Sequence, residues 1–272
     1  MNGEWIRRPK VAGYYYPANR SALESELDRL IPAQETARPS IAAIVPHGGY
    51  HLSGSVTGRT LGRVAIPSRC IILAPNHAGY GPAWSLMTEG AYQTPLGEVP
   101  VDRNLARAMC EACSLLSPDA SAHLAEHAIE TILPFLQRRG PSTLHIVPLV
   151  IDSDEWETCR SVGHALACAV RQTNLSVLII ASAELTHYES REIVCEKDQR
   201  LLAAVHALDA PHLLAERAAL ESRMCGAGPI ACALEAAKLL GATQSHLIEY
   251  HTSADHGGDP DSAIGYAGVL VN

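Results

Sequence analysis

Short, continuous runs of apolar residues recur along the chain and are separated by longer segments of helical periodicity. The runs do not alternate between apolar and polar positions. Such runs are typical of strands that are covered on both faces. We predict strands over six of them: Ile41–Pro46, Arg69–Pro75, Leu144–Val150, Leu175–Ser182, His246–His251 and Ala263–Val271.

Helical patterns fill the segments between these runs. The first is predicted to begin at a capping box formed by Ser21 and Glu24. The last begins with Pro229 in its first turn and stops at Gly241. The others are predicted over Gly54–Val64, Arg103–Leu115, Glu126–Arg138, Asp154–Gln172, Ser190–Leu208 and Pro211–Leu220. The turn-rich segment Tyr80–Val101 is expected to hold hairpin strands.

This alternation of strands and helices predicts an α/β fold with a central mixed, largely parallel sheet flanked by helices. Neither an internal repeat nor a linker divides the chain, so we predict a single domain over residues 1–272. Hydrophobic residues make up 47% of the chain and charged residues 18%, which is enough apolar material for a buried core.

Charge and composition exclude several classes of function. The formal net charge of -8 disfavours binding to nucleic acid. No run of about 18 apolar residues predicts a membrane span, and the N-terminal residues lack the apolar region of a signal peptide. We therefore expect a cytoplasmic protein whose eight cysteines are reduced, most of them as small buried side chains. The pair Cys110 and Cys113 lacks the further ligands of a zinc site.

Thirteen histidines equal the number of Phe, Trp and Tyr residues together, and three of them follow predicted strands. His47 follows the first strand, His77 the second, and Glu184 and His187 the fourth. Ligands of α/β sheets bind beyond the carboxyl ends of strands. Three imidazoles and a carboxylate at such positions predict a metal or acid/base site.

Two further segments carry candidate chemistry. Cys225 stands in a glycine-rich turn before a helix, where the helix dipole favours a thiolate. It is either a nucleophile or metal ligand, or a structural cysteine. Glu126 and Glu130 are expected on one helix face beside His127, either in the site or facing solvent. The roles of His51, His251 and His256 stay open, and the other six histidines are predicted to be structural or exposed: His123, His145, His164, His206, His212 and His246.

Specific motifs run from one end of the chain to the other in a recognisable order. They are AGYYYPAN, VPHGGYHLSGSVTG, LAPNHAGYG, YQTPLGEVPVD, EHAIETILPFL, VLIIASAELTHY, CGAGPI and SAIGYAGVLV. Through them the chain resembles the MEMO family, which includes AmmeMemoRadiSam system protein B. That family is similar in fold to the class III extradiol ring-cleaving dioxygenases.

The resemblance implies a metal held by His47, His77 and Cys225. It places His187 and Glu184 beside the metal as acid/base or substrate-orienting groups. His127 becomes a further pocket residue, and we expect Tyr16 and Tyr50 to contact the substrate. The family usually has Asp where this chain has Glu184, so the anionic ligand is either Cys225 or Glu184. Fe(II) is the expected metal, with Cu and Zn as alternatives.

We expect a non-haem iron dioxygenase that acts on a small aromatic or phenolic compound with O2. One alternative is a non-catalytic iron- or copper-binding module that acts through protein partners or redox control. A second alternative is a zinc hydrolase with Glu184 as general base. The resemblance further implies radical-SAM and AMMECR-type proteins as pathway partners.

Overall fold

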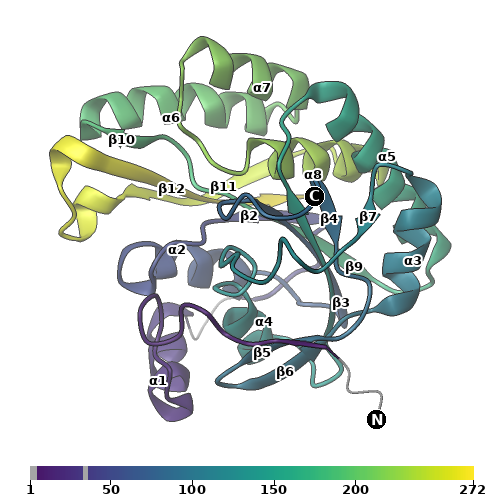
Figure 1. Ribbon diagram of the computed structural model, residues 1–272. Helices are drawn as coiled ribbons and strands as arrows, with labels where there is room; N and C mark the ends of the chain where they lie inside the picture. The colour runs from purple at the N-terminus through teal and green to yellow at the C-terminus, as the bar shows by residue number, and fades with distance from the viewer. Residues whose placement is uncertain (1–4, 33–35) are drawn as a thin grey trace.

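Four adjacent parallel strands form the centre of a nine-stranded sheet in the computed structural model, which describes residues 5–32 and 36–272 (Figure 1). In order they are β2 (Ala42–Val45), β9 (Val177–Ser182), β3 (Arg69–Pro75) and β8 (His145–Ile151). Beyond β2 lie the antiparallel strands β12 (Ala263–Val271), β10 (His187–Glu189) and β11 (Ser245–Thr252). Beyond β8 lie β4 (Trp84–Leu86), antiparallel to it, and β7 (Ser117–Pro118). The predicted mixed α/β sheet and all six predicted strands are confirmed.

Helices cover both faces of this sheet (Figure 1). In β3, Ile71 and Leu73 pack into one core cluster, and Cys70 and Ile72 pack into the other. Both sets of side chains are buried, which explains why the strand is apolar throughout. The first face carries α3 (Arg103–Ala112), α5 (Trp156–Gln172), α6 (Arg191–His206), α7 (Ala210–Ala219) and α8 (Ala227–Leu239). The second carries α1 (Arg20–Leu30), α2 (Tyr50–Gly62) and α4 (Leu133–Arg139).

The predicted hairpin is confirmed within a separate small sheet. Strands β5 (Ala91–Thr94) and β6 (Gly97–Pro100) pair antiparallel, and β1 (Ile6–Arg7) pairs with β5. In Figure 1 this sheet lies beside α4 and away from α6 and α7. Its strand β1 ties the start of the chain to the rest of the molecule. The first four residues of the predicted domain, and residues 33–35, lie outside the described residues.

Three predicted helix starts are wrong. The helix predicted over Glu126–Arg138 begins only at Leu133, because Pro134 lacks an N–H and fits the first turn. The helix predicted from Gly54 begins at Tyr50, directly after Gly49. At α1 the cap is not Ser21 but Asn19, whose side chain accepts a hydrogen bond from the N–H of Ala22 at 3.1 Å.

The described cysteines are free thiols. Of the four that we expect to be buried, Cys70, Cys159, Cys168 and Cys232, all but Cys168 are buried, and Cys113 is buried as well. Cys168 instead faces solvent from α5. Among the described residues, we find no helix that combines the length and apolar character needed to span a membrane.

Candidate metal and proton-transfer site

The carboxyl ends of three central strands meet at one polar cavity. His47 follows β2, His77 follows β3, and Glu184 follows β9. Cys225 is brought beside them by an antiparallel bridge to Glu184. The cavity has a volume of about 500 Å3, and its polar lining side chains are His47, His51, His77, His127, Glu184, His187, Arg223 and Cys225, with Tyr14, Tyr15, Tyr188 and Tyr266. The structure thus brings together all six predicted metal and acid/base residues.

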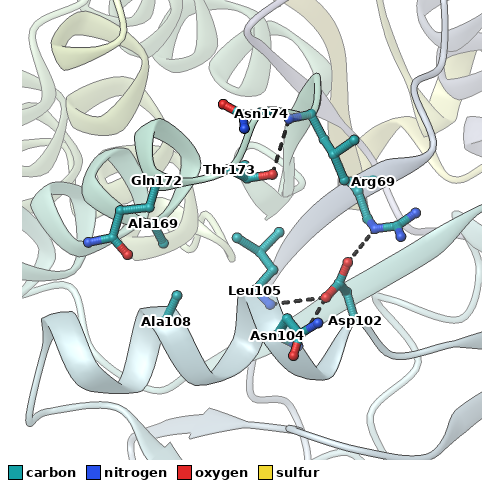
Figure 2. A pocket seen from close by; sticks show the side chains of 10 residues that line it. Arg69, Asp102, Asn104, Leu105, Ala108, Ala169, Gln172, Thr173 and Asn174 are labelled. Atoms are coloured by element: carbon teal, nitrogen blue, oxygen red, sulfur yellow. Dashed lines mark hydrogen bonds and ion pairs between the residues drawn. The ribbon is translucent and has the colours of Figure 1, made fainter.

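A second hollow, of about 420 Å3, lies at the opposite ends of the strands and has a different character (Figure 2). Arg69, which begins β3, is paired there with Asp102. Asp102 also caps α3 by accepting hydrogen bonds from the N–H groups of Asn104 and Leu105. Neither histidine nor cysteine lines this hollow. The carboxyl-end cavity is therefore the better candidate for a metal.

The tautomer of His47 is fixed by a buried hydroxyl. Ser182, at the end of β9, donates its only hydroxyl proton to the carbonyl of Ala128 at 2.7 Å. Its oxygen lies 2.8 Å from Nδ1 of His47, so it accepts from an Nδ1–H. The lone pair of His47 is consequently on Nε2, which lies 3.3 Å from Sγ of Cys225. Burial, followed by the neighbouring histidines, holds the pKa of His47 well below 6.5.

His77 is oriented by a carboxylate. Its Nδ1 lies 3.0 and 3.2 Å from the two oxygens of Glu126, and its backbone N–H donates to the same group at 2.7 Å. Glu126 is fully buried. Burial lowers the pKa of His77, but the hydrogen bond and charge of Glu126 outweigh this and raise it. A carboxylate on Nδ1 leaves Nε2 as the ligand atom, an arrangement that strengthens an imidazole as a metal ligand.

Glu184 and His187 share one proton. Nδ1 of His187 lies 2.7 Å from the carbonyl of Leu185 and must be protonated, because a carbonyl only accepts. Its Nε2 lies 3.0 Å from Oε2 of Glu184, so one of these two atoms carries a proton between them. The other carboxylate oxygen, Oε1, is buried and has no hydrogen-bond partner among the described residues. An orphaned carboxylate oxygen in such a cavity is suited to accept a proton, a metal or a substrate hydroxyl.

Two overlapping groups of side chains have ligand atoms within 4.8 Å of one another. One is His47, His77 and His127, and the other is His47, Glu184 and Cys225. The rings of His77 and His127 stack with centroids 4.8 Å apart. The predicted ligands His47, His77 and Cys225 are drawn from both groups, so this set stays a prediction. All of these donors fit a divalent transition metal.

The expected thiolate at Cys225 is not supported by its surroundings. Burial, and then the charge of Glu184, raise the pKa of this thiol well above its usual value. The helix does not offset this, because α8 begins only at Ala227, after Gly226 in a left-handed conformation. Without a metal Cys225 is a thiol. Deprotonation requires a cation, which is how metals acquire thiolate ligands.

Tyr16 and Tyr50 do not line the cavity, in contrast to their predicted contact with substrate. Both are buried. The Tyr16 hydroxyl donates to Glu130 at 2.6 Å, and the Tyr50 hydroxyl donates to the carbonyl of Thr131 at 2.8 Å. Apolar neighbours bury these rings in the second core cluster. The tyrosines of the cavity are instead Tyr14, Tyr15, Tyr188 and Tyr266.

Glu126 and Glu130 are both buried and serve different partners rather than one helix face. Glu126 holds His77, whereas Glu130 pairs with Arg7. Sequence reasoning missed two residues of the site. Ser182 orients His47, and Arg223 lines the cavity. Ser182 is the one hydroxyl residue at the carboxyl end of an otherwise apolar strand, a signal that could have been used. Arg223 carried no recognisable signal.

Of the three histidines left open, His51 lines the cavity. His251 and His256 instead contact each other, with ring centroids 4.2 Å apart. Nε2 of His251 bonds the carbonyl of Leu52 at 2.9 Å.

The fold and the site together define a class. This is an α/β protein with a mixed sheet and candidate metal ligands in a cavity at the carboxyl ends of its parallel strands. A model of the family described as Memo-like protein matches residues 7–270. The chain belongs to this family.

Curated relatives agree in length with this chain. A MEMO1 family protein of Methanothermobacter thermautotrophicus is 37% identical over 96% of this chain and 99% of its own. Another MEMO1 family protein, from Aquifex aeolicus, is 33% identical over 97% of this chain and 98% of its own. Among solved structures, an uncharacterized protein of Escherichia coli K12 aligns with a TM-score of 0.55 and 15% identity, over 85% of this chain and 99% of that one. This last likeness concerns the fold alone.

Proposed function

We propose that this protein is an iron(II)-dependent dioxygenase that acts on a small phenolic compound. The observation that carries the proposal is the convergence of two oriented imidazoles with a thiol that a bound metal would deprotonate. Nε2 of His47 faces Sγ of Cys225 at 3.3 Å, and Nδ1 of His77 is held by Glu126. Bound iron(II) would leave coordination positions open for a phenolate and dioxygen, which is the chemistry it supplies.

The chain's own groups supply proton transfer. A phenolic substrate must lose a proton before its oxygen can act as an anionic ligand. The pair Glu184 and His187 holds one exchangeable proton, and both residues line the cavity. The partnerless Oε1 of Glu184 can take up the phenolic proton while the proton shared at Oε2 resides on Nε2 of His187. Tyr15, whose ring packs edge-on against that of His127 with centroids 5.1 Å apart, also lines the cavity.

The test is anaerobic reconstitution with Fe(II), followed by measurement of O2 uptake with catechol, 4-methylcatechol and 3,4-dihydroxybenzoate. We expect uptake above background for the wild type and loss of bound iron in His47→Ala. His187→Gln should keep the iron but lower turnover by about 10²- to 10⁴-fold, the usual contribution of acid/base catalysis. His246→Ala is the control, because His246 is exposed on β11 and does not line the cavity.

Two results would overturn the proposal in different ways. Iron bound tightly without O2 uptake on any catechol would favour the non-catalytic metal-binding module. Ester hydrolysis with Zn, combined with inactivity with Fe, would favour the hydrolase.

A further inference from the structure

The mouth of the cavity carries a cationic side chain that the proposed chemistry does not use. Arg223 lines the cavity together with Tyr188 and Cys225. Its side chain is exposed, and no hydrogen bond or ion pair joins it to a described residue. The other charged group that lines the cavity is Glu184, with Glu126 behind His77. Arg223 is thus an unpaired cation at the opening of a site whose floor is acidic.

The backbone on both sides of Arg223 is held firmly. The hydroxyl of Ser222 is hydrogen-bonded to that of Thr186 at 2.9 Å, and both residues are buried. Met224 packs into the first core cluster, and its N–H donates to Ser222 Oγ at 3.3 Å. Fixed neighbours confine the Cα atom of Arg223 to the cavity mouth. Because this backbone is already ordered, a ligand that binds Arg223 has only the side chain to immobilise.

An exposed aromatic residue with an unusual backbone lies on the same mouth. Tyr188 has φ of 60°, in the left-handed region that non-glycine residues rarely adopt. Its ring is 60% exposed and lies 5.3 Å from that of His187. Strained residues of this kind persist where the surrounding structure imposes them, often at ligand sites. Tyr188 therefore provides an aromatic surface for a planar ring in the cavity that Arg223 also lines.

We infer that Arg223 determines specificity by binding a carboxylate on an aromatic substrate, which makes the substrate class a phenolic aromatic acid. This inference rests on the proposed function, because the phenolic end is assigned to the metal and to Glu184. The aromatic ring packs against the tyrosines of the cavity, Tyr188 and Tyr266, and the carboxylate pairs with Arg223. A guanidinium matches a carboxylate in a two-bond geometry that lysine does not reproduce.

A carboxylate suits this site better than a phosphate. Arg223 is the one Lys or Arg residue among those that line the cavity. A phosphate carries up to two negative charges and is usually held by several cationic or N–H donors. The carboxylates of Glu184 and Glu126 would repel a second negative charge. The single positive charge of Arg223 matches the single negative charge of a carboxylate.

Two probes with the same ring test this inference by anaerobic calorimetric titration of the Fe(II)-loaded protein. One is 3,4-dihydroxybenzoate and the other is 4-methylcatechol, which lacks the carboxylate. We expect Arg223→Gln to lower the affinity for 3,4-dihydroxybenzoate by about 10- to 100-fold, which is the range for the loss of a hydrogen bond to a charged group. The affinity for 4-methylcatechol should stay within about twofold. Arg223→Lys should recover part of the loss, because lysine keeps the charge but not the geometry.

Arg200→Gln is the matched control. Arg200 is a half-exposed arginine of α6 paired with Glu216, and it should change the affinity for neither probe. If Arg223→Gln leaves both affinities unchanged, or weakens both equally, the inference is refuted while the proposed function stands. If the wild type binds neither probe, the proposed function itself fails. Inorganic phosphate that competes with 3,4-dihydroxybenzoate in the wild type, but not in Arg223→Gln, would assign Arg223 to phosphate and overturn the choice of a carboxylate.

Discussion

Single hydrogen bonds decide which atoms of the histidine cluster can act as ligands. Ser182 accepts from Nδ1 of His47, and Glu126 accepts from Nδ1 of His77. Both imidazoles therefore present Nε2 as their free lone pair. Groups of this kind fix the ring orientation and basicity of metal-binding histidines, and their loss usually costs 10- to 100-fold in metal affinity. The buried hydroxyl of Ser182 thus has a functional role as well as a structural one.

We expect Ser182→Ala to reduce the affinity for Fe(II) by about 10- to 100-fold, because Nδ1 of His47 loses its acceptor and the ring is free to adopt the other tautomer. Stability should fall by about 1–3 kcal/mol for each of the two buried hydrogen bonds that the Ser182 hydroxyl makes. Both quantities are measurable, by metal titration against a competing chelator and by denaturant unfolding of the metal-free protein.

Ser85→Ala is the matched control for this variant. Ser85 is also fully buried, and its hydroxyl donates to Asp119 at 3.0 Å, outside the cavity lining. Its loss should also lower the stability, since a buried hydrogen bond is removed, but without affecting metal affinity. Equal metal affinities in wild type and Ser182→Ala would show that Ser182 does not set the tautomer of His47.

At the scale of elements, the turn before α8 determines where Cys225 lies. Gly226 has φ of 83°, and a Cβ atom there would lie 2.6 Å from Cβ of Ala183 and 2.7 Å from the carbonyl of Ser182. The turn is packed against the end of β9, the same strand end that carries Glu184. Contact between these two segments thus places Cys225 beside Glu184.

We expect Gly226→Ala to be markedly more destabilising than Gly257→Ala. Gly257 has nearly the same φ, 86°, but open space around its Cα atom. Both substitutions should cost about 1–2 kcal/mol for a left-handed alanine. The clash at Gly226 should add about 1–3 kcal/mol to this loss of stability. It should also move Cys225 away from Glu184, which should weaken iron binding. Comparison of the two variants by thermal unfolding isolates this clash. Equal losses of stability would show that the turn is not packed tightly.

Helix α6 contributes a buried carboxylate that links it to β11. Asp198 accepts a hydrogen bond from the N–H of Thr186 and another from the hydroxyl of Tyr250, each at 2.9 Å. Burial nevertheless raises the pKa of Asp198 from 3.8 to about 6. The folded protein therefore binds this proton more tightly than the unfolded chain. The stabilisation from this proton is complete below about pH 4 and is lost as the pH rises through 6.

Asp198→Asn should remove this pH dependence. Relative to the wild type, the variant should gain up to about 3 kcal/mol of unfolding free energy between pH 4 and pH 7, from a shift of about two pKa units. Denaturant unfolding of both proteins across this range measures the difference. A difference that does not change with pH would mean that Asp198 titrates normally in the folded protein.

Elements were predicted from the sequence more successfully than side-chain environments. All six apolar strands were predicted, because runs such as that of β3 are apolar wherever both faces are covered. The histidines at the strand ends followed from the same pattern. The orientation of the side chains could not be predicted in this way. Glu130 and Tyr16, for example, are hydrogen-bonded although they lie 114 positions apart in the chain. Contacts of this range depend on tertiary packing, and neither helical spacing nor the strand-end rule can reveal them.

At the scale of the whole molecule, one buried ion pair joins the start of the chain to the loop that carries Glu126 and His127. Arg7, in β1, is paired with Glu130, and the two side chains are 1% and 0% exposed. Arg7 also donates to the carbonyl of Glu126, and to that of His123 at 3.0 Å. The same carboxylate accepts from the backbone N–H of Lys10 at 2.9 Å and from that of Val11 at 3.0 Å, in the segment that leads to Tyr14 and Tyr15. This ion pair therefore supports both the loop that carries Glu126 and His127 and the segment that carries Tyr14 and Tyr15.

Glu130→Gln should lower the free energy of unfolding by about 3–5 kcal/mol, because it leaves the Arg7 guanidinium buried without its countercharge. It should also weaken the binding of 4-methylcatechol, since the segment with Tyr14 and Tyr15 loses one of the two acceptor oxygens that hold it. Arg29→Gln breaks an exposed pair on α1 and should cost at most about 1 kcal/mol. Chemical unfolding and calorimetric titration of the three proteins measure both effects. If Glu130→Gln costs no more than Arg29→Gln, the N-terminal segment is held by its apolar contacts, and the ion pair does not couple it to the site.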